Sequence, residues 1–227
     1  MPNIHNLLTQ FNIKTNNEAA YQLAFTHSSF NNDANTVHHD YERLEFMGDA
    51  VIGFVVAELT YRYHPTMSPG LMTKTRSKLV QSKNLAQLAR KYRFDQYIRI
   101  GHSLGSINLA ISDRILEDVF EAFFGAVYIE QGLAFTVKLL ESIFSEPVQH
   151  IDIETLTDYK SQLQEAMQAE EQQAVEYFLV KTEGPAHDRL FTVEVRFNEL
   201  VLGHGSGKTK QQAEQMAAKE ALQKKAV

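Results

Sequence analysis

Apolar residues in the first two thirds of the chain recur at the spacing of amphipathic helices. The clearest example is the stretch 41–63, where Leu44, Met47 and Val51 fall on one side of a helix. His64-Pro65 ends this helix, because the residue before a proline avoids the α region. Further helices are predicted at 17–25, 73–92, 107–131 and 133–144. With a loop at 101–106 and no strand of convincing length, the pattern predicts an all-helical domain over residues 1–146.

The pattern changes after residues 147–157, which contain few apolar side chains and are predicted to form a linker. In the stretch 190–197, Phe191, Val193 and Val195 alternate with polar residues, as in a strand with one buried face. Further strands are predicted at 175–181 and 200–204, between helices at 158–170 and 209–225. Residues 158–227 are therefore predicted to form a small α+β domain with the order α-β-β-β-α.

Three acidic residues lie at helical spacing near the start of the 41–63 stretch. Glu42, Glu45 and Asp49 are three and four residues apart, so they share one side of a helix although like charges at that spacing repel. Gly48 beside them costs a helix about 1 kcal/mol relative to alanine, which indicates close helix packing or close ligand approach. This stripe is a candidate site, and the alternative is that each acid is an ordinary solvated helix residue.

A second acidic pair, Asp118 and Glu121, lies on an otherwise very apolar helical segment. Such carboxylates are expected to be partly buried, which is costly unless they are paired or bound to a metal. Glu117 is adjacent but points about 100° away around the helix, so it is interpreted as solvated. If the two helices meet, Glu45 and Asp49 join the pair in an oxygen-only cluster. That ligand set suits Mg²⁺ or Mn²⁺ and predicts metal-assisted phosphodiester hydrolysis.

Composition narrows the classes of function. The 227 residues are 44% apolar and 22% charged, which is typical of a globular protein and excludes a disordered chain. The absence of cysteine excludes disulfides, thiol catalysis and cysteine-bound metals, and fits a reducing cytosol. No apolar run approaches the roughly 20 residues of a membrane span, and no secretory signal is visible. A cytoplasmic protein without a membrane partner is therefore expected.

Net charge argues mildly against a nucleic-acid partner, because the chain carries −6 and such partners usually meet basic surfaces. The final stretch, 203–227, is basic, with five lysines against Glu214 and Glu220. Within it, Gly207-Lys208-Thr209 is not a P-loop, since the glycine that this motif needs five residues earlier is Leu202. No nucleotide cofactor is expected, and any contact with nucleic acid depends on local placement of charge.

Several segments resemble the bacterial ribonuclease III family. Glu42-Arg-Leu-Glu-Phe-Met-Gly-Asp49 is similar to the signature of that family. Ile115-Leu-Glu-Asp-Val-Phe-Glu-Ala122, followed by Gly125-Ala-Val-Tyr128, resembles its second acidic helix. Thr26-His27-Ser28-Ser29 is similar to an early Thr-His-x-Ser element of the family. The order and spacing of these segments match over nearly the whole chain.

The resemblance implies an all-α endonuclease domain that cuts double-stranded RNA with Mg²⁺, or with Mn²⁺ in its place. It implies a metal-binding role for Glu45, Asp49, Asp118 and Glu121. Of these, Asp49 and Glu121 would also be catalytic, and Glu42 would lie near the substrate or a dimer interface. The products would carry 5′-phosphate and 3′-hydroxyl ends with short 3′ overhangs. Precursors of ribosomal RNA and some mRNAs would be the substrates.

A homodimer is also expected. The resemblance implies dimerisation through the helical domain, whose helices are rich in aromatic residues. These residues offer more apolar surface than one small helical domain readily buries. They include Phe46, Phe54, Phe120, Phe123 and Phe124.

The α-β-β-β-α domain resembles a double-stranded-RNA-binding domain, which reads RNA by shape through 2′-hydroxyls and phosphates. Three contact regions are expected from this resemblance. They are Gln164, Glu165 and Gln168 on the first helix, His187 in the loop between the first two strands, and Lys208 and Lys210 before the last helix. Taken singly these are ordinary surface residues, and together on this order of elements they favour RNA.

Three residues depart from the family patterns. Ala50 replaces a common serine, Pro69 stands where an acidic residue is common, and Gln211 replaces a basic residue. None of them removes a metal ligand that the resemblance implies, so an active enzyme is expected. The alternative is a non-catalytic double-stranded-RNA-binding or ribosome-associated protein on the same fold. That alternative predicts the loss of at least one of the four acids, and all four are present.

Overall fold

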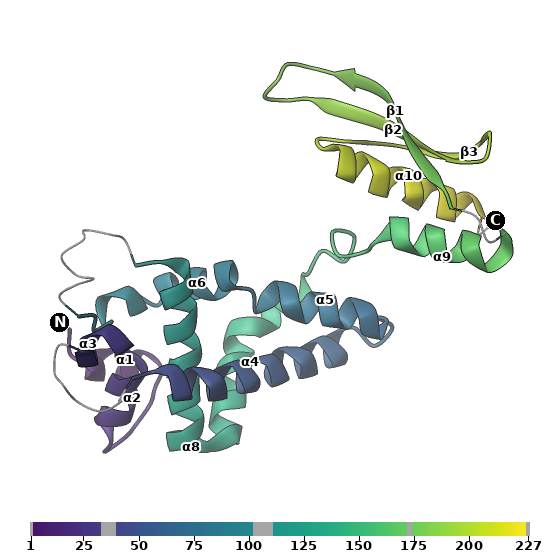
Figure 1. Cartoon of the computed structure of the whole chain (residues 1–227). Helices are drawn as coiled ribbons and strands as arrows, with labels where there is room; N and C mark the ends of the chain where they lie inside the picture. The colour runs from purple at the N-terminus through teal and green to yellow at the C-terminus, as the bar shows by residue number, and fades with distance from the viewer. Residues whose placement is uncertain (1, 33–39, 102–110, 172–173, 226–227) are drawn as a thin grey trace. The chain divides into compact units, whose positions relative to one another are not determined.

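The computed structural model describes residues 2–32, 40–101, 111–171 and 174–225. The chain divides into two compact units, residues 1–156 and 157–227. The first unit is helical, and the second combines a three-stranded sheet with two helices (Figure 1). The predicted order, an all-helical part followed by α-β-β-β-α, is confirmed.

The larger unit is organised around two long helices, α4 (Glu42–Tyr63) and α8 (Asp113–Gln149), which cross in Figure 1. Their contact is the most extensive between any two described elements. Around them lie α1 (Ile4–Gln10), α2 (Glu18–Ala24), α3 (Ser28–Asn32), α5 (Pro69–Leu79), α6 (Ser82–Lys91) and the 3-10 turn η1 (Phe94–Gln96). The two long helices contribute many of the buried core residues. They also carry the acids of the predicted site.

Two glycines allow α4 and α8 to touch through their backbones. A Cβ atom on Gly48 would lie 1.8 Å from the backbone oxygen of Glu121, and one on Gly125 would lie 2.0 Å from that of Leu44. No larger residue fits at either position, because protein interiors are already close-packed. The cost of a glycine inside α4 is thus offset by a crossing that brings the acidic turns of both helices together.

Aromatic rings fill the core of the larger unit. Phe120, Phe123 and Phe124 of α8 are fully buried. The Phe123 ring lies 5.1 Å from that of Phe11 and 5.0 Å from that of Phe94, centroid to centroid. The interpretation of these three α8 rings as dimer surface is therefore wrong, because they join α8 to η1 and to the N-terminal segment. By length and composition α8 could cross a membrane, but a core helix has the same composition, and here its apolar face is buried.

Some predicted boundaries in the larger unit differ from the structure. The stretch 73–92 forms two helices, because Gln81 adopts an extended conformation (φ −67°, ψ 150°) between α5 and α6. The predicted break between the helices 107–131 and 133–144 is confirmed as a kink of α8 at Gly132, whose φ of 79° favours glycine. The helix then continues over Pro147 into the predicted linker and ends at Gln149. Residues 102–110, which hold the start of the predicted 107–131 helix and most of the predicted loop, lie outside the described residues.

In the smaller unit, α9 (Tyr159–Glu171) and α10 (Lys210–Lys225) lie on the same side of an antiparallel sheet (Figure 1). Its strands are β1 (Glu176–Glu183), β2 (Leu190–Phe197) and β3 (Leu200–Gly207), in that order. Buried Val193 and Val195 of β2 pair with Gly205 and Gly203 of β3. A Cβ atom on Gly205 would lie 2.1 Å from the backbone nitrogen of Ala217, so β3 packs on α10 through its backbone.

Candidate active site

The acids of α4 and α8 line one pocket of about 720 Å³, where the N-terminal halves of the two helices meet. All four residues predicted to bind metal contribute to its wall, and so does Glu42. The pocket therefore brings together side chains that are far apart in the sequence. Its remaining lining residues are His27, Ser28, Tyr41, Phe46, Arg114, Ile115 and Glu117.

The four acids lie at different depths. Glu121 is 9% exposed, Glu45 and Asp118 are half-buried, and Asp49 is exposed. Glu121 is the deepest because its backbone is in contact with Gly48 at the helix crossing. The pocket thus has a closed end at Glu121 and an open end at Asp49.

Burial raises the pKa values of three carboxyls in this pocket, and repulsion between acids adds to the effect at two of them. Burial raises the pKa of Glu121 to about 8, and the charges of Asp49 and Glu117 add to the effect. Burial also raises the pKa of Glu45 to about 6, with Asp118 as the charged neighbour that adds most. The pKa of Asp118 is raised by burial as well. A cation inside the pocket would relieve this repulsion and favour the charged forms.

Glu117 belongs to this pocket, and its interpretation as a solvated residue is wrong. It is half-buried, and its charge contributes to the raised pKa values of Glu45 and Glu121. The lining residues of α8 span an arc of about 160° at 100° per residue, and Glu117 lies at one edge of that arc. The face used by the pocket is therefore wider than a single stripe of acids suggests.

The carboxylates do not form a closed metal cage. Among the described residues, no three acids or histidines stand close enough together to hold a metal ion as a ready-made group. This is compatible with Mg²⁺, which keeps several waters and is usually bound through one or two carboxylates together with substrate phosphates. The donor set fits as well, because carboxylate oxygens suit Mg²⁺ and Mn²⁺. The residues present therefore fit a hydrated divalent cation.

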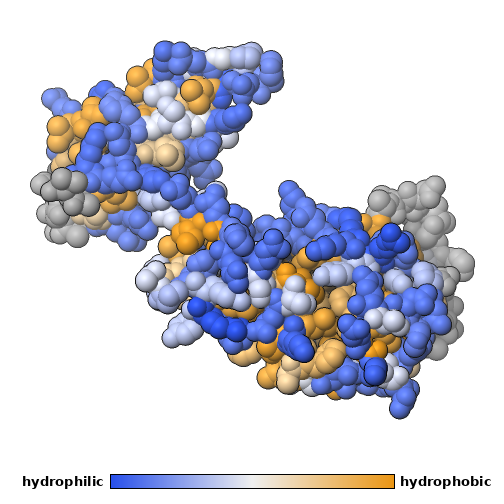
Figure 2. All heavy atoms as spheres, turned by 180° about the vertical axis from the view of Figure 1, so that it is seen from behind, coloured by the Kyte–Doolittle hydropathy of each residue, from blue (hydrophilic) through white to orange (hydrophobic). Residues whose placement is uncertain are grey.

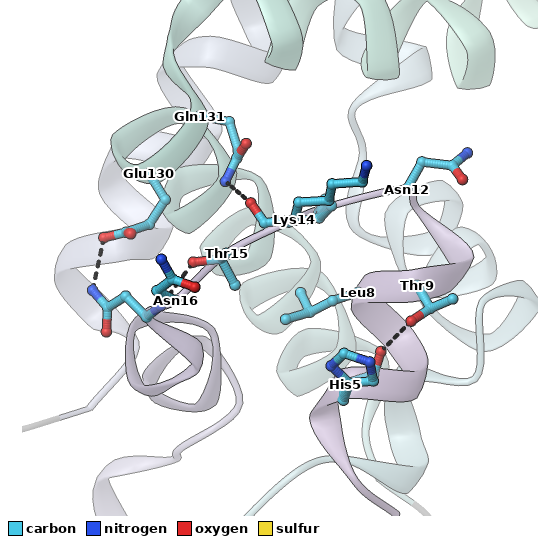
Figure 3. A pocket seen from close by; sticks show the side chains of 11 residues that line it. His5, Leu8, Thr9, Asn12, Lys14, Thr15, Asn16, Glu130 and Gln131 are labelled. Atoms are coloured by element: carbon cyan, nitrogen blue, oxygen red, sulfur yellow. Dashed lines mark hydrogen bonds between the residues drawn. The ribbon is translucent and has the colours of Figure 1, made fainter.

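A cavity of about 800 Å³ near the N-terminus is larger than the acidic pocket but has a different character. Figure 3 shows α1, the segment after it and α8 contributing to its wall. Its acid, Glu130, accepts a hydrogen bond from Asn17 Nδ2 (3.0 Å), and Gln131 Nε2 donates to the backbone oxygen of Lys14 (3.2 Å). These polar groups connect the N-terminal segment to α8. The acidic pocket is therefore the better candidate site, although it is the smaller cavity.

Four of the residues expected to contact RNA in the smaller unit are exposed: Glu165, His187, Lys208 and Lys210. Lys208 Nζ lies 3.1 Å from Asp188 Oδ1, which links the loop between β1 and β2 to the start of α10. His187 is the neighbour of Asp188 in that loop, so two of the three expected contact regions lie side by side.

Gln164 has a structural contact that the sequence does not reveal. Its Oε1 accepts a hydrogen bond from the Val175 N–H (3.2 Å), so it braces the segment that leads into β1. Its Nε2 is buried and has no hydrogen-bond partner in the described part of the chain. Contact with a 2′-hydroxyl would therefore require this side chain to turn outward. The side chain of Gln168, the other glutamine of this region, lies outside the described residues.

The helical domain contains a basic segment that its average charge does not reveal. Between Glu58 and Asp95 the chain has eight lysines and arginines and no acid, in a protein whose net charge is −6. Lys74, Arg76 and Lys83 of this segment are exposed and form no ion pair with any described residue. The signal that identifies this surface is the absence of acids over a long stretch, which a local charge count would have found.

Two protein-family models match the chain. A model described as Ribonuclease-III-like matches residues 17–147, and the double-stranded RNA binding motif matches residues 159–225. The chain is 37% identical over 221 residues to Ribonuclease 3 of Latilactobacillus sakei, which covers 97% of this chain and 96% of that relative. It is 41% identical over 202 residues to Ribonuclease 3 of Bacillus cereus, which covers 88% and 82% of the two chains.

Solved structures give the same picture. The nuclease domain of ribonuclease III from Campylobacter jejuni matches with a TM-score of 0.59 at 28% identity, covering 67% of this chain and all of that one. A second structure of that domain, described for flexibility in a region involved in dimer formation, has a TM-score of 0.57 at 29% identity, covering 63% and 99%. Dicer from Pichia stipitis matches with a TM-score of 0.50 at 26% identity, over 92% of this chain and 94% of that one.

Proposed function

Since the chain belongs to the ribonuclease III family of double-stranded-RNA endonucleases, we propose that its acidic pocket hydrolyses RNA phosphodiester bonds with the help of Mg²⁺. Mn²⁺ would substitute for it, because both ions prefer oxygen ligands. The observation that carries the proposal is the meeting of Glu45, Asp49, Asp118 and Glu121 in one pocket. The raised pKa of Glu121, about 8, supports it, because a bound cation would stabilise the charged forms of these carboxyls.

The acids have different roles in this proposal. A divalent cation bound here would lower the pKa of a coordinated water and offset charge on the phosphate. Glu45 and Asp118, half-buried on opposite helices, would hold the ion directly or through its waters. Asp49 at the open end and Glu121 at the closed end would also bind it, directly or through its waters, and would position the reacting groups as the catalytic pair. Glu42, exposed on the first turn of α4, lies beside the substrate or the dimer partner.

Affinity for RNA comes from surfaces outside the pocket in this proposal. In the smaller unit, Lys208 and Lys210 bind phosphates, while Gln164, Glu165, Gln168 and His187 reach the minor grooves. In the larger unit, the basic residues of α5 and α6 add phosphate contacts. Local placement of charge therefore resolves the conflict between a net charge of −6 and an RNA substrate.

We further propose that the chain forms a homodimer through α4. Figure 2 shows hydrophobic residues gathered between hydrophilic ones on one face of the larger unit. On α4 itself, Phe46, Phe54 and Tyr61 are 76%, 53% and 73% exposed. Together with Ala50, Gly53 and Ala57 they fall within an arc of about 100°. Small residues between large exposed rings allow the same helix of a second copy to approach closely across a two-fold axis.

Phe54 provides the test of this dimer, because it does not line the acidic pocket. Phe54→Asp places a charge in the proposed interface, so the variant is expected to be a 25.8 kDa monomer by light scattering, while the native chain has twice that mass. Tyr63→Asp, on the same helix outside the arc, is the control and should stay dimeric. A native chain that is monomeric at micromolar concentration would contradict the proposed interface.

Products and substrates follow from a two-fold arrangement. Two pockets related by the axis would cut both strands, giving 5′-phosphate and 3′-hydroxyl ends with short 3′ overhangs. We propose duplex segments of ribosomal RNA precursors and of some mRNAs as the substrates in the cytoplasm. Sequencing of RNA ends in cells that lack the chain would test this, since uncut precursors should accumulate. Blunt products from a purified duplex would argue against the two-site geometry.

The central experiment compares cleavage with binding. Asp49→Asn and Glu121→Gln keep the shape of each side chain but remove its charge. Cleavage of a plain RNA duplex with Mg²⁺ is expected to fall about 10²–10³-fold or more, because transition-state charge loses its partner. Binding of the same duplex should change little, since phosphate and groove contacts supply the affinity.

Glu58→Gln is the matched control, because Glu58 is an exposed acid of α4 outside the pocket. It should cleave at the native rate. Near-native cleavage by either pocket variant would contradict the catalytic role proposed for that residue. Full cleavage by the native chain in the presence of excess EDTA would contradict the role of a divalent cation.

A further inference from the structure

Tyr41 reaches from the start of α4 to an acid of α8. Its side chain is 4% exposed, and its Oη donates a hydrogen bond to Asp118 Oδ2 at 3.1 Å. The two residues are 77 positions apart in the sequence. The contact occupies one carboxylate oxygen of Asp118 and leaves the other for a different partner.

The backbone of Tyr41 is held at a junction of several segments. Its N–H donates to the Thr26 backbone oxygen (3.1 Å), and its own oxygen accepts from the Glu45 N–H (2.9 Å). Thr26 is in turn bridged to Arg99 in a short parallel pairing. Tyr41 therefore has little freedom to move, and its hydroxyl has a defined place relative to α8.

His27 supports Tyr41 from the other side. The two rings meet edge to face, with centroids 5.7 Å apart. The Ser29 N–H donates to His27 Nδ1 (3.1 Å), and Ser29 Oγ lies 2.8 Å from the same nitrogen. These contacts to Nδ1 fix the orientation of the His27 ring against Tyr41. Ser29 Oγ also accepts a hydrogen bond from the Gly101 N–H (3.0 Å), so the serine that contacts His27 is itself held in place.

We propose that Tyr41 is a positioning residue that orients Asp118 for metal binding, and that His27 and Ser29 act through Tyr41. The inference deepens the proposed function and rests on it. It also gives a role to the Thr26–Ser29 element, which carries no acid. Residues that orient metal ligands in this way typically contribute about 10–100-fold to metal affinity or activity.

Tyr41→Phe tests the inference, because it removes only the hydroxyl. Mn²⁺ alone would be titrated into the full-length, RNA-free protein, with binding followed by the relaxation rate of water protons. We expect Mn²⁺ to bind about 10-fold more weakly than to the native chain. At low Mg²⁺, kcat should fall while KM for the duplex stays the same, and high Mg²⁺ should restore most of the rate.

The control is Tyr21→Phe, another fully buried tyrosine of the same unit, which loses a 3.2 Å hydrogen bond from Gln131. It should unfold at about the same urea concentration as Tyr41→Phe but bind Mn²⁺ like the native chain. If Tyr41→Phe also binds Mn²⁺ like the native chain, its hydroxyl is only structural and the inference is overturned. A native chain that neither binds Mn²⁺ nor cuts RNA would overturn the proposed function itself.

A double-mutant cycle tests the part played by His27. His27→Ala is expected to weaken Mn²⁺ binding by less than Tyr41→Phe does, because Tyr41 keeps its backbone anchors. Combined with Tyr41→Phe, it should add little, since the hydroxyl through which it acts is already gone. Fully additive effects would show that His27 acts on Asp118 by a separate route and would overturn the proposed order.

Discussion

The deepest functional side chains of the larger unit and the exposed ones of the smaller unit lie in opposite environments. In the larger unit they are acids at a helix crossing, where Glu121 is 9% exposed and neighbouring carboxylates repel one another. In the smaller unit, Glu165, His187, Lys208 and Lys210 are all exposed. Chemistry on a phosphodiester needs groups held in a fixed, partly desolvated place, whereas phosphate contacts need only charge at the right spacing. The functional site of the larger unit therefore lowers the stability of that unit. The functional site of the smaller unit has no such cost.

The largest effect is expected from the helix crossing. Gly48→Ala would place a Cβ atom 1.8 Å from the backbone oxygen of Glu121, so α4 and α8 must move apart. We expect a loss of about 3 kcal/mol in the free energy of unfolding, measured with urea. Cleavage should fall about 100-fold or more in the fraction that stays folded, because the acids of the two helices would lose their relative position.

Gly70→Ala is the control for Gly48→Ala, because nothing lies within 4 Å of a Cβ atom there. It should leave stability and cleavage close to those of the native chain. The comparison between the units predicts one further result: RNA binding by the smaller unit should survive Gly48→Ala. Native cleavage by the Gly48→Ala variant would show that the crossing does not set the geometry of the site.

A smaller but more specific effect is expected from Glu121→Gln in metal-free protein. The pKa of Glu121 is raised from 4.5 to about 8, so between these values the folded chain keeps a proton that the unfolded chain has lost. Stability therefore falls as pH rises from about 4.5 to 8. The glutamine side chain of the variant would carry no charge to desolvate. We expect the variant to be about 1–3 kcal/mol more stable than the native chain at pH 8 and equally stable at pH 4.

Urea unfolding in EDTA at several pH values would measure this difference. A stability difference that does not change with pH would show that Glu121 is not the group whose burial is costly. Added Mg²⁺ should narrow the gap, because it stabilises the native chain more than the variant. The variant that loses cleavage would then be the more stable one, as expected where a site carries unfavourable charge.

Helical spacing was sufficient to predict the acids of α4 and α8, because positions three and four residues apart share a side of a helix whatever surrounds it. The same rule failed for Glu117. Which arc of α8 lines the pocket depends on how α4 crosses it, and that angle depends on the backbone contacts of Gly48 and Gly125. A sequence shows a glycine in a helix, but not the partner that the glycine touches.

Contacts between distant segments could not be predicted from the sequence either. The hydrogen bond from Tyr41 to Asp118 joins two helices, and the one from the Val175 N–H to Gln164 joins a helix to the approach of a strand. Alternation predicted that Val193 would be buried, as it is, but Glu194 on the other face of β2 is buried as well (8% exposed). Local rules therefore predict the apolar side chains that face inward, and the fold decides which other groups they meet.

The smallest effects are expected at the exposed cations, where each lost phosphate contact lowers the slope of log K against log salt by about 0.7–0.9. Lys208→Ala/Lys210→Ala should flatten the slope by about 1.5 and weaken all duplex sequences alike. Asp188→Asn should strengthen binding a few-fold, because it releases Lys208 from a 3.1 Å ion pair.

The basic segment of the larger unit extends this prediction and decides how far the two units differ. Lys74→Ala/Arg76→Ala should flatten the slope by a similar amount if α5 contacts phosphates. Lys14→Ala/Lys138→Ala, two exposed lysines outside both basic surfaces, is the control and should leave the slope unchanged. If the α5 pair behaves like this control while the Lys208/Lys210 pair does not, the larger unit supplies chemistry alone. An equal change of slope for all three pairs would instead mean that RNA responds to the overall charge of the protein. No phosphate contact at a particular position would then distinguish one lysine from another.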